Sequence, residues 1–86
     1  MGPIPRRVSP SDDGSAFTMP VNTTATLQIH STDYANPTVT GESVLLIPMV
    51  NVAPGGPAEW EIRAVAPGTS TVHGTSPRFT FTITVP

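Results

Sequence analysis

The stretch RFTFTITV, residues Arg78–Val85, decides the fold class of this 86-residue chain. Aromatic or aliphatic side chains occupy every second position, and threonine fills most of the positions between them. Successive side chains of a β-strand point to opposite faces, so a period of two predicts a strand with one face buried and the other in water. Threonine is also common in strands, because its branched Cβ suits a pleated surface. This stretch is therefore predicted to form a half-buried strand.

Similar patterns elsewhere in the chain predict further short strands. Residues 24–30 and 60–64 alternate between apolar and polar side chains, and residues 44–50 (VLLIPMV) are apolar at every position. Shorter strands are expected through Val39 and through residues 71–73. Segments rich in turn-forming residues separate these strands at intervals of roughly 8–12 residues. The arrangement predicts an all-β fold, a single immunoglobulin-like antiparallel β-sandwich of about 6–7 strands.

The apolar faces of the alternating strands predict one hydrophobic core. Its expected members are Leu27, Ile29, Trp60, Ile62, Phe79, Phe81 and Ile83. A chain of 86 residues suits one domain and is too short for two. Residues 1–16 contain three prolines and a cluster of serine, aspartate and glycine without an apolar period, so they are predicted to form a flexible N-terminal tail or linker. The domain itself is predicted to span residues 17–86.

Charge and composition exclude several classes of function. The chain has four basic residues, all arginine, and a net charge of −2. Two of the arginines, Arg6 and Arg7, lie in the predicted tail, whereas nucleic-acid binding needs clustered cations, so no nucleic-acid partner is expected. No apolar run approaches the roughly 20 residues of a membrane-spanning helix, so membrane insertion is not expected. The absence of cysteine excludes disulfides and thiolate chemistry.

The titratable residues form no recognisable catalytic or metal-binding pattern. His30, His73 and Asp33 lack the spacing of a metal site. Glu59 and Glu61 lie two positions apart on one predicted strand face, and the neighbouring arginine continues the row, as expected for a solvated charge ladder. The G-x-S-x-G pattern of a hydrolase nucleophile is absent from the sequence. The sequence therefore predicts a non-enzymatic protein with no cofactor and no metal.

The apolar run at residues 44–50 is the strongest sequence signal for a partner. A strand in a two-layer sandwich hides one face, so a strand that is apolar on both faces exposes about three apolar side chains unless something covers them. Pro48 cannot donate a ladder hydrogen bond, which places it at a sheet edge or a bulge. Either a protein partner or neighbouring domain packs on Leu46, Pro48 and Val50, or a bulge at Pro48 turns the later residues into the core.

The stretch WEIRAVAPGTSTV, residues 60–72, and the alternating strand after it resemble the C-terminal half of bacterial immunoglobulin-like domains. The matching residues are Ala64, Val65, Pro67, Gly68, Thr69, Thr71 and Val72. The resemblance implies a non-enzymatic structural or adhesion module of a bacterial secreted or cell-surface protein. It therefore also implies an extracellular or cell-surface location.

The same half also resembles chagasin-like cysteine protease inhibitors, which share this sandwich and use its loops to plug a protease cleft. Asn36-Pro37-Thr38 echoes part of that family's Asn-Pro-Thr-Thr-Gly-Tyr motif, and Gly55-Gly56 echoes its glycine loop. The family's Arg-Pro-Trp loop has no counterpart at Ser76-Pro77-Arg78. Two alternative functions follow from the shared fold, a cysteine protease inhibitor and a small carbohydrate-binding module.

Overall fold

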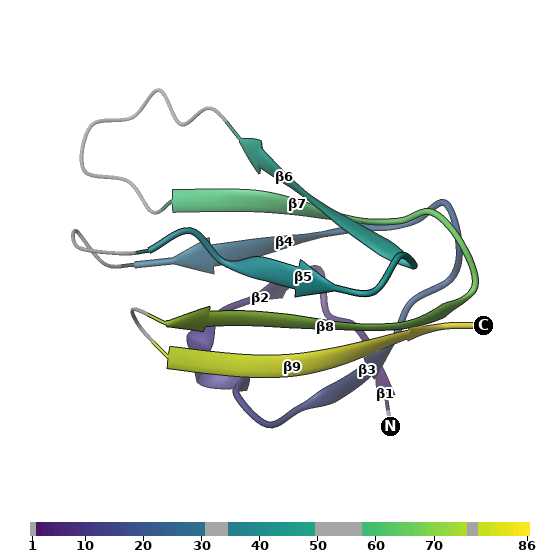
Figure 1. Cartoon of the computed structure of the whole chain (residues 1–86), viewed down its shortest axis with the longest axis horizontal. Coiled ribbons are helices and arrows are strands. Elements are labelled where there is room, and N and C mark those ends of the chain that lie inside the picture. Colours follow the sequence, from purple (N-terminus) through teal and green to yellow (C-terminus); the bar gives the residue numbers. More distant parts are fainter. Residues whose placement is uncertain (1, 31–34, 50–57, 76–77) are drawn as a thin grey trace.

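Two β-sheets pack face to face in the computed structural model, which describes residues 2–30, 35–49, 58–75 and 78–86 (Figure 1). The strands are β1 (Gly2–Pro3), β2 (Arg7–Val8), β3 (Ala16–Thr18), β4 (Thr24–Ile29), β5 (Thr38–Thr40), β6 (Val44–Met49), β7 (Ala58–Ala64), β8 (Gly68–Thr75) and β9 (Arg78–Val85), and one 3-10 turn, η1, spans Pro10–Asp12. The five-stranded sheet has the order β1-β3-β9-β8-β5, and the four-stranded sheet has the order β2-β4-β7-β6. The predicted all-β sandwich is confirmed.

The strands predicted from alternation pair in the antiparallel sense. Leu27 of β4 lies opposite Trp60 of β7, and Val72 of β8 lies opposite Phe81 of β9. The short N-terminal strands pair in parallel instead: β1 with β3, β2 with β4, and β3 with β9. The sheets are therefore mixed, and they contain more strands than the 6–7 predicted. A strand of two or three residues carries too little pattern to be recognised in a sequence.

The N-terminal segment differs from the tail predicted for residues 1–16. Val8 is 2% exposed and belongs to the core, and Ile4 packs against that core. Backbone bonds tie the segment to both sheets, since Ile4 N donates to Thr18 O over 2.8 Å and Thr26 N donates to Arg6 O over 2.9 Å. Edge strands tolerate proline, so the prolines of this segment do not exclude pairing. Its few apolar residues give no periodic signal, which is why the sequence resembles a linker.

The core lies between the two sheets and contains every residue predicted for it. Its buried hydrophobic members are Val8, Met19, Ala25, Leu27, Ile29, Val44, Trp60, Ile62, Ala64, Val72, Phe79, Phe81, Ile83 and Val85. The rings of Phe79 and Phe81 stack with their centroids 5.9 Å apart, and Phe17 meets Phe81 edge-on at 5.9 Å. Such aromatic pairs add about 0.5–1.5 kcal/mol beyond the area they bury. All three rings belong to neighbouring strands of the five-stranded sheet, so they form one aromatic cluster on the side of that sheet that faces the core.

Strand β6 lies at the edge of the four-stranded sheet, so the sandwich covers only part of its uninterrupted apolar sequence. Val44 is buried, Leu46 is partly buried against the core, and Leu45 and Met49 are exposed. Pro48 lies in the same edge strand, as its missing donor requires, and it is exposed. Of the three residues predicted as a partner interface, Leu46 and Pro48 are thus placed, whereas Val50 lies outside the described residues. Their contact with a partner stays a prediction.

Candidate functional site at the loop end

In the four-stranded sheet, the chain leaves β4 and β6 and enters β7 at one end. Ile29, the last residue of β4, lies opposite Ala58, the first residue of β7. Met49, the last residue of β6, lies opposite Glu59. Figure 1 shows these strand termini on its left-hand side. The ladder registers therefore bring the β4–β5 and β6–β7 connections to the same end of the sandwich.

The five-stranded sheet brings a third connection to that end. Thr75 of β8 lies opposite Arg78 of β9, and the two strand termini lie on the same side of Figure 1 as the others. We call this end, where β4, β6 and β8 end and β5, β7 and β9 begin, the loop end. Residues 31–34, 50–57 and 76–77 of the three connections lie outside the described residues. The predicted glycine loop and most of the Ser76-Pro77-Arg78 segment are among them.

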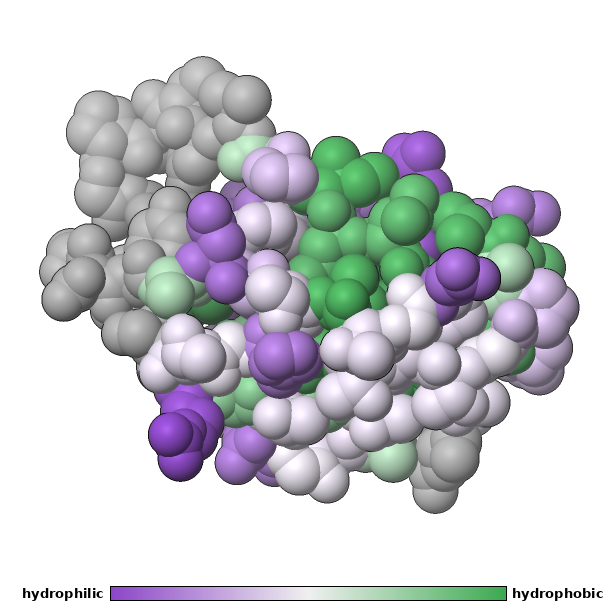
Figure 2. Space-filling model, in the orientation of Figure 1, coloured by the Kyte–Doolittle hydropathy of each residue, from purple (hydrophilic) through white to green (hydrophobic). Residues whose placement is uncertain are grey.

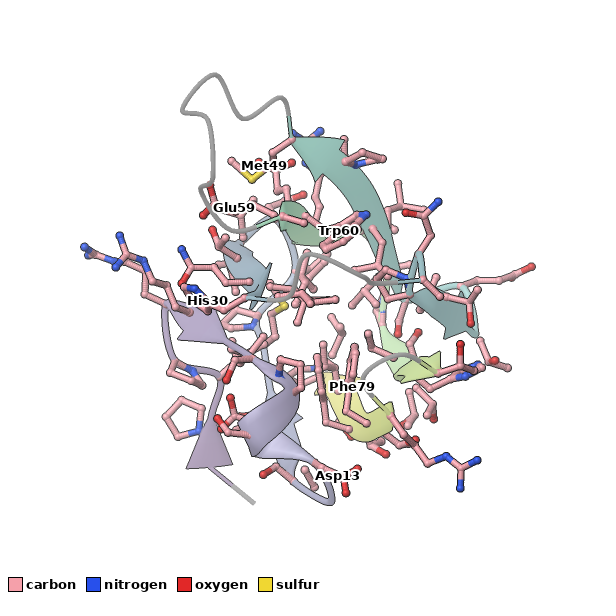
Figure 3. All side chains as sticks on the ribbon, turned by 90° about the vertical axis from the view of Figure 1, so that its left-hand side faces the viewer. Asp13, His30, Met49, Glu59, Trp60 and Phe79 are labelled. Carbon is pink, nitrogen blue, oxygen red and sulfur yellow. The ribbon has the colours of Figure 1, made fainter. Side chains whose placement is uncertain are left out.

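The N-terminal segment is hydrogen-bonded to the first residues of β9 at the loop end. Asp13, which follows η1, accepts a hydrogen bond at Oδ1 from the Thr80 backbone N–H over 2.7 Å. Gly14 N donates to Thr80 O over 2.7 Å, so both polar backbone atoms of Thr80 are bonded to this segment. Figure 3, which faces the loop end, shows Asp13 beneath Phe79. The start of β9 is therefore held by residues that the sequence assigned to a tail.

Polar and apolar side chains meet on the four-stranded side of the loop end. Gln28 Nε2 donates to Glu59 Oε2 over 2.8 Å, across the β4–β7 pair. Met49 is 44% exposed and His30 is exposed, and Figure 3 shows both at this end. Because its carboxylate is held by the glutamine amide, Glu59 is part of the sheet surface. Met49, which lies opposite Glu59, adds an exposed apolar side chain to this surface.

The partial motif Asn36-Pro37-Thr38 lies at the same end, where the chain enters β5. Pro37 is buried and anchors the segment, while Asn36 and Thr38 are exposed. A hydrogen bond joins Thr38 Oγ1 and His73 Nε2 over 2.9 Å, across the β5–β8 pair. The bond fixes the start of β5 against β8, directly after the exposed Asn36 and the buried Pro37. Residues 31–34 of the same connection are not described.

A rigid hydrophobic layer lies directly behind the loop end. Trp60 is 5% exposed and Phe79 is 1% exposed, one from each sheet, and Figure 3 shows both between the layers. The prediction that Trp60 belongs to the core is confirmed. A buried indole has no free face to stack on a sugar ring, so Trp60 gives no support to carbohydrate binding. It packs in the core at the end of the sandwich from which the connections leave.

The other candidate residues of the sequence do not combine into a reactive site. His73 lies in the five-stranded sheet and His30 directly follows β4 of the four-stranded sheet, while Asp33 lies outside the described residues. Within the described part of the chain, no cluster of three histidine, aspartate or glutamate side chains is placed to hold a metal ion. Arg63 Nη2 lies 2.8 Å from Glu61 Oε2 on the outer face of β7. This is the predicted solvated charge row, and an exposed pair of this kind contributes about 0–1 kcal/mol.

Two hydrogen bonds at the loop end, Asp13–Thr80 and Gln28–Glu59, could not be predicted from the sequence. The Asp13–Thr80 bond joins residues 67 positions apart and depends on the path of the N-terminal segment. The Gln28–Glu59 bond follows from the β4–β7 register, and alternation predicts only that both side chains face outward. None of the helical residues that the structure describes forms a segment long and apolar enough to cross a membrane.

No family model and no curated protein sequence matches this chain. Among solved structures, the fold is similar to the crystal structure of the cysteine protease inhibitor EhICP2 from Entamoeba histolytica, with a TM-score of 0.73, 13% identity, and coverage of 94% of this chain and 94% of that one. It is also similar to the solution structure of amebosin, with a TM-score of 0.50, 10% identity, and coverage of 93% of this chain and 96% of the other. Identities this low establish a shared fold alone. The comparisons give no support to the predicted membership of the bacterial immunoglobulin-like family.

Proposed function

We propose that this domain is a non-enzymatic inhibitor of papain-type cysteine proteases and that it binds them through the loop end. The observation that carries the proposal is the similarity of fold to a cysteine protease inhibitor over 94% of both chains. This favours the inhibitor among the functions predicted from the sequence, ahead of an adhesion module. The partial Asn36-Pro37-Thr38 motif at the loop end supports the same choice.

The architecture suits an inhibitor that works by occupying a cleft. Loops positioned by a rigid scaffold are the usual carriers of binding, because a scaffold that is already ordered reduces the entropy lost on association. Strands of both sheets end and begin at the loop end, and the buried Trp60 and Phe79 lie behind these strand termini. The N-terminal segment holds the start of β9 through Asp13 and Gly14. The flanks of the proposed binding loops are thus fixed before a protease arrives.

The chemistry of the described loop-end surface also suits a peptide-binding cleft. Such clefts are lined with apolar side chains and a few polar groups. The loop end presents the exposed Met49, the amide of Asn36, and the bonded Thr38–His73 pair. The carboxylate of Glu59 already accepts a hydrogen bond from Gln28 of the same chain before any interface forms. Desolvating a bonded carboxylate costs less than desolvating a free one.

Titration of papain with the purified domain tests the proposal. Papain activity on a fluorogenic peptide should fall to zero at about one equivalent of domain, with an inhibition constant on the order of nanomolar, as in other protease–inhibitor pairs of standard size. Trypsin, which uses a serine nucleophile, should stay active under the same conditions. Full papain activity at a tenfold molar excess of domain would contradict the proposal.

A loop replacement localises the effect. Replacing residues 50–57 by a glycine-serine segment of equal length should weaken papain inhibition by at least about tenfold, because the replacement removes the side chains of these residues and a glycine-serine segment loses much conformational entropy when it is ordered on binding. The matched controls are Val21→Ser and Val65→Ser, each 40% exposed at the opposite end of the sandwich. Circular dichroism confirms the fold of each variant. Equal inhibition by the loop variant and the controls would place the binding surface elsewhere.

A further inference from the structure

The turn that leads into β4 contains the sequence Asn22-Thr23-Thr24. It matches the acceptor motif for N-linked glycosylation, which is Asn-x-Ser/Thr with any residue except proline at x. The motif requires two functional groups, the carboxamide of the asparagine and the hydroxyl two residues later. Such a short match also arises by chance, so it counts only where the fold presents both groups at the surface.

Backbone hydrogen bonds fix this turn and leave both of the required groups in solvent. Asn22 N donates to Ala64 O over 2.9 Å, and Ala64 N donates to Thr23 O over 3.0 Å. The Thr23 hydroxyl donates to Pro20 O over 2.6 Å, so the middle residue of the motif is used within the turn. Asn22 and Thr24 are both exposed, and neither side chain has a hydrogen-bond partner among the described residues.

A second asparagine of the chain shows what the motif excludes. Asn36-Pro37-Thr38 has the same first and third residues, but proline at the middle position rules out glycosylation. The hydroxyl of Thr38 is also hydrogen-bonded to His73 Nε2 over 2.9 Å. The chain therefore holds a matched pair of sites, a complete motif in the turn before β4 and a blocked motif at the loop end.

Two exposed valines flank Asn22. Val21 directly precedes it, and Val65 directly follows Ala64, whose carbonyl accepts the Asn22 N–H. Each valine is 40% exposed, and they are two of the four large hydrophobic side chains exposed in the described part of the chain. Figure 2 shows hydrophobic surface reaching the end of the sandwich opposite the loop end, on the right-hand side of the view. A sugar linked to Asn22 is placed to cover this pair with its apolar C–H face.

We propose that Asn22 is a site of N-linked glycosylation and that the first sugar of the glycan packs over Val21 and Val65. The donor is an oligosaccharide carried on a lipid diphosphate, and an oligosaccharyltransferase catalyses the transfer. A bond forms between Asn22 Nδ2 and C1 of the first sugar, and the bond between C1 and the diphosphate oxygen breaks. The lipid diphosphate leaves with that bonding pair, and Nδ2 gives one proton to a base of the transferase. Nothing is oxidised or reduced.

The position of Asn22 suits a glycan on a binding domain. Strand β4 begins at Thr24 and ends at Ile29 at the loop end, so Asn22 lies at the opposite end of the sandwich. The modified atom lies beyond the backbone groups that hold the turn, so the folded structure accepts the glycan unchanged. Because transfer takes place in the secretory pathway, the proposal includes the extracellular location expected from the sequence. It goes beyond the proposed inhibitor and does not depend on it.

Production of the chain in eukaryotic cells behind a cleavable secretion signal tests the acceptor site. Mass spectrometry of the chain from medium and cells should show a glycan on Asn22 that peptide-N-glycosidase removes. Thr24→Val, which removes the hydroxyl and keeps the branched shape, should abolish the glycan, and Thr24→Ser should retain it. The control Asn36→Gln should change nothing. A chain without a glycan on Asn22, or a glycan that Thr24→Val leaves in place, overturns the proposal.

Trimming the glycan to its first sugar with an endoglycosidase tests the packing. The single-sugar form should unfold at a higher urea concentration than the same chain made in bacteria, which carries no sugar. The double variant Val21→Ser/Val65→Ser should lose at least about half of this rise, because the sugar then has no apolar partner. The control Met49→Ser, at the loop end, should keep the full rise. No rise in the unsubstituted chain, or an equal rise without the valines, contradicts the packing over Val21 and Val65.

Discussion

The two ends of the sandwich differ in how the chain turns. At the end opposite the loop end, short turns are held by hydrogen bonds, whereas the connections at the loop end include the longer segment 50–57. Gly41 and Ser43 lead from β5 to β6, and Ser43 N and Oγ both bond to Ser70 Oγ within the core. Val65 N donates to Ser43 O over 2.9 Å, which adds the β7–β8 connection to the same cluster. Buried hydroxyls and short turns therefore fix this end. The difference teaches that the turns of one end are part of the core packing, whereas the proposed binding surface is assigned to the other end.

The comparison predicts its largest effect at Gly41. Its φ is +109°, and a Cβ there would lie 2.7 Å from Ser70 Oγ and 2.8 Å from Thr69 O. Gly41→Ala should lower the free energy of unfolding by about 3 kcal/mol or more, because backbone strain and overpacking add. Urea denaturation measures the loss. The folded fraction should still inhibit papain with an unchanged inhibition constant.

A matched glycine at the loop end separates strain from crowding. Gly14 has a φ of +83°, yet a Cβ there would meet no atom within 4 Å. Gly14→Ala should therefore cost only the strain, about 1 kcal/mol. If Gly14→Ala and Gly41→Ala destabilise the domain equally, the crowding at the opposite end has no energetic weight and the comparison of the two ends fails on this point.

An effect between those of the two glycine variants is expected in the N-terminal segment, which connects both ends of the sandwich. Val8 is buried in the core, and Val8→Ala should lower the free energy of unfolding by about 2 kcal/mol from lost burial and the remaining cavity. Val21→Ala, at an exposed valine, is the control and should change stability by less than about 0.5 kcal/mol. Equal denaturation midpoints for the two variants would mean that residues 1–16 behave as the tail that their composition indicates.

Long alternating segments made most of the fold predictable. The strands at residues 24–29 and 78–85 have periods that admit a single interpretation, and their apolar faces define the core correctly. The N-terminal strands were missed because Ile4 and Val8 stand alone among prolines and arginines, where no period can form. Their parallel pairing depends on the path of the chain between the sheets, and no local pattern encodes that path.

The candidate site was less predictable than the fold. The apolar run at residues 44–50 identified β6 as unusual, and it selected Leu46 and Pro48; the structure packs Leu46 partly against the core and leaves Pro48 exposed together with Leu45 and Met49. When every residue of a strand is apolar, the odd and even positions look alike, so the sequence does not show which face is buried. The loop end is a product of strand order, because connections far apart in the sequence meet only when β4, β7 and β9 are arranged in space.

Isothermal titration calorimetry of the domain with papain, free and with its active-site cleft covalently blocked, tests the central claim most directly. The account predicts one-to-one binding to free papain, with a dissociation constant on the order of nanomolar. It predicts at least about a hundredfold weaker binding to blocked papain, because the loop end and the blocking group compete for one cleft, a difference of about 2.7 kcal/mol. Equal binding to the two forms, or no binding to either, would contradict the account.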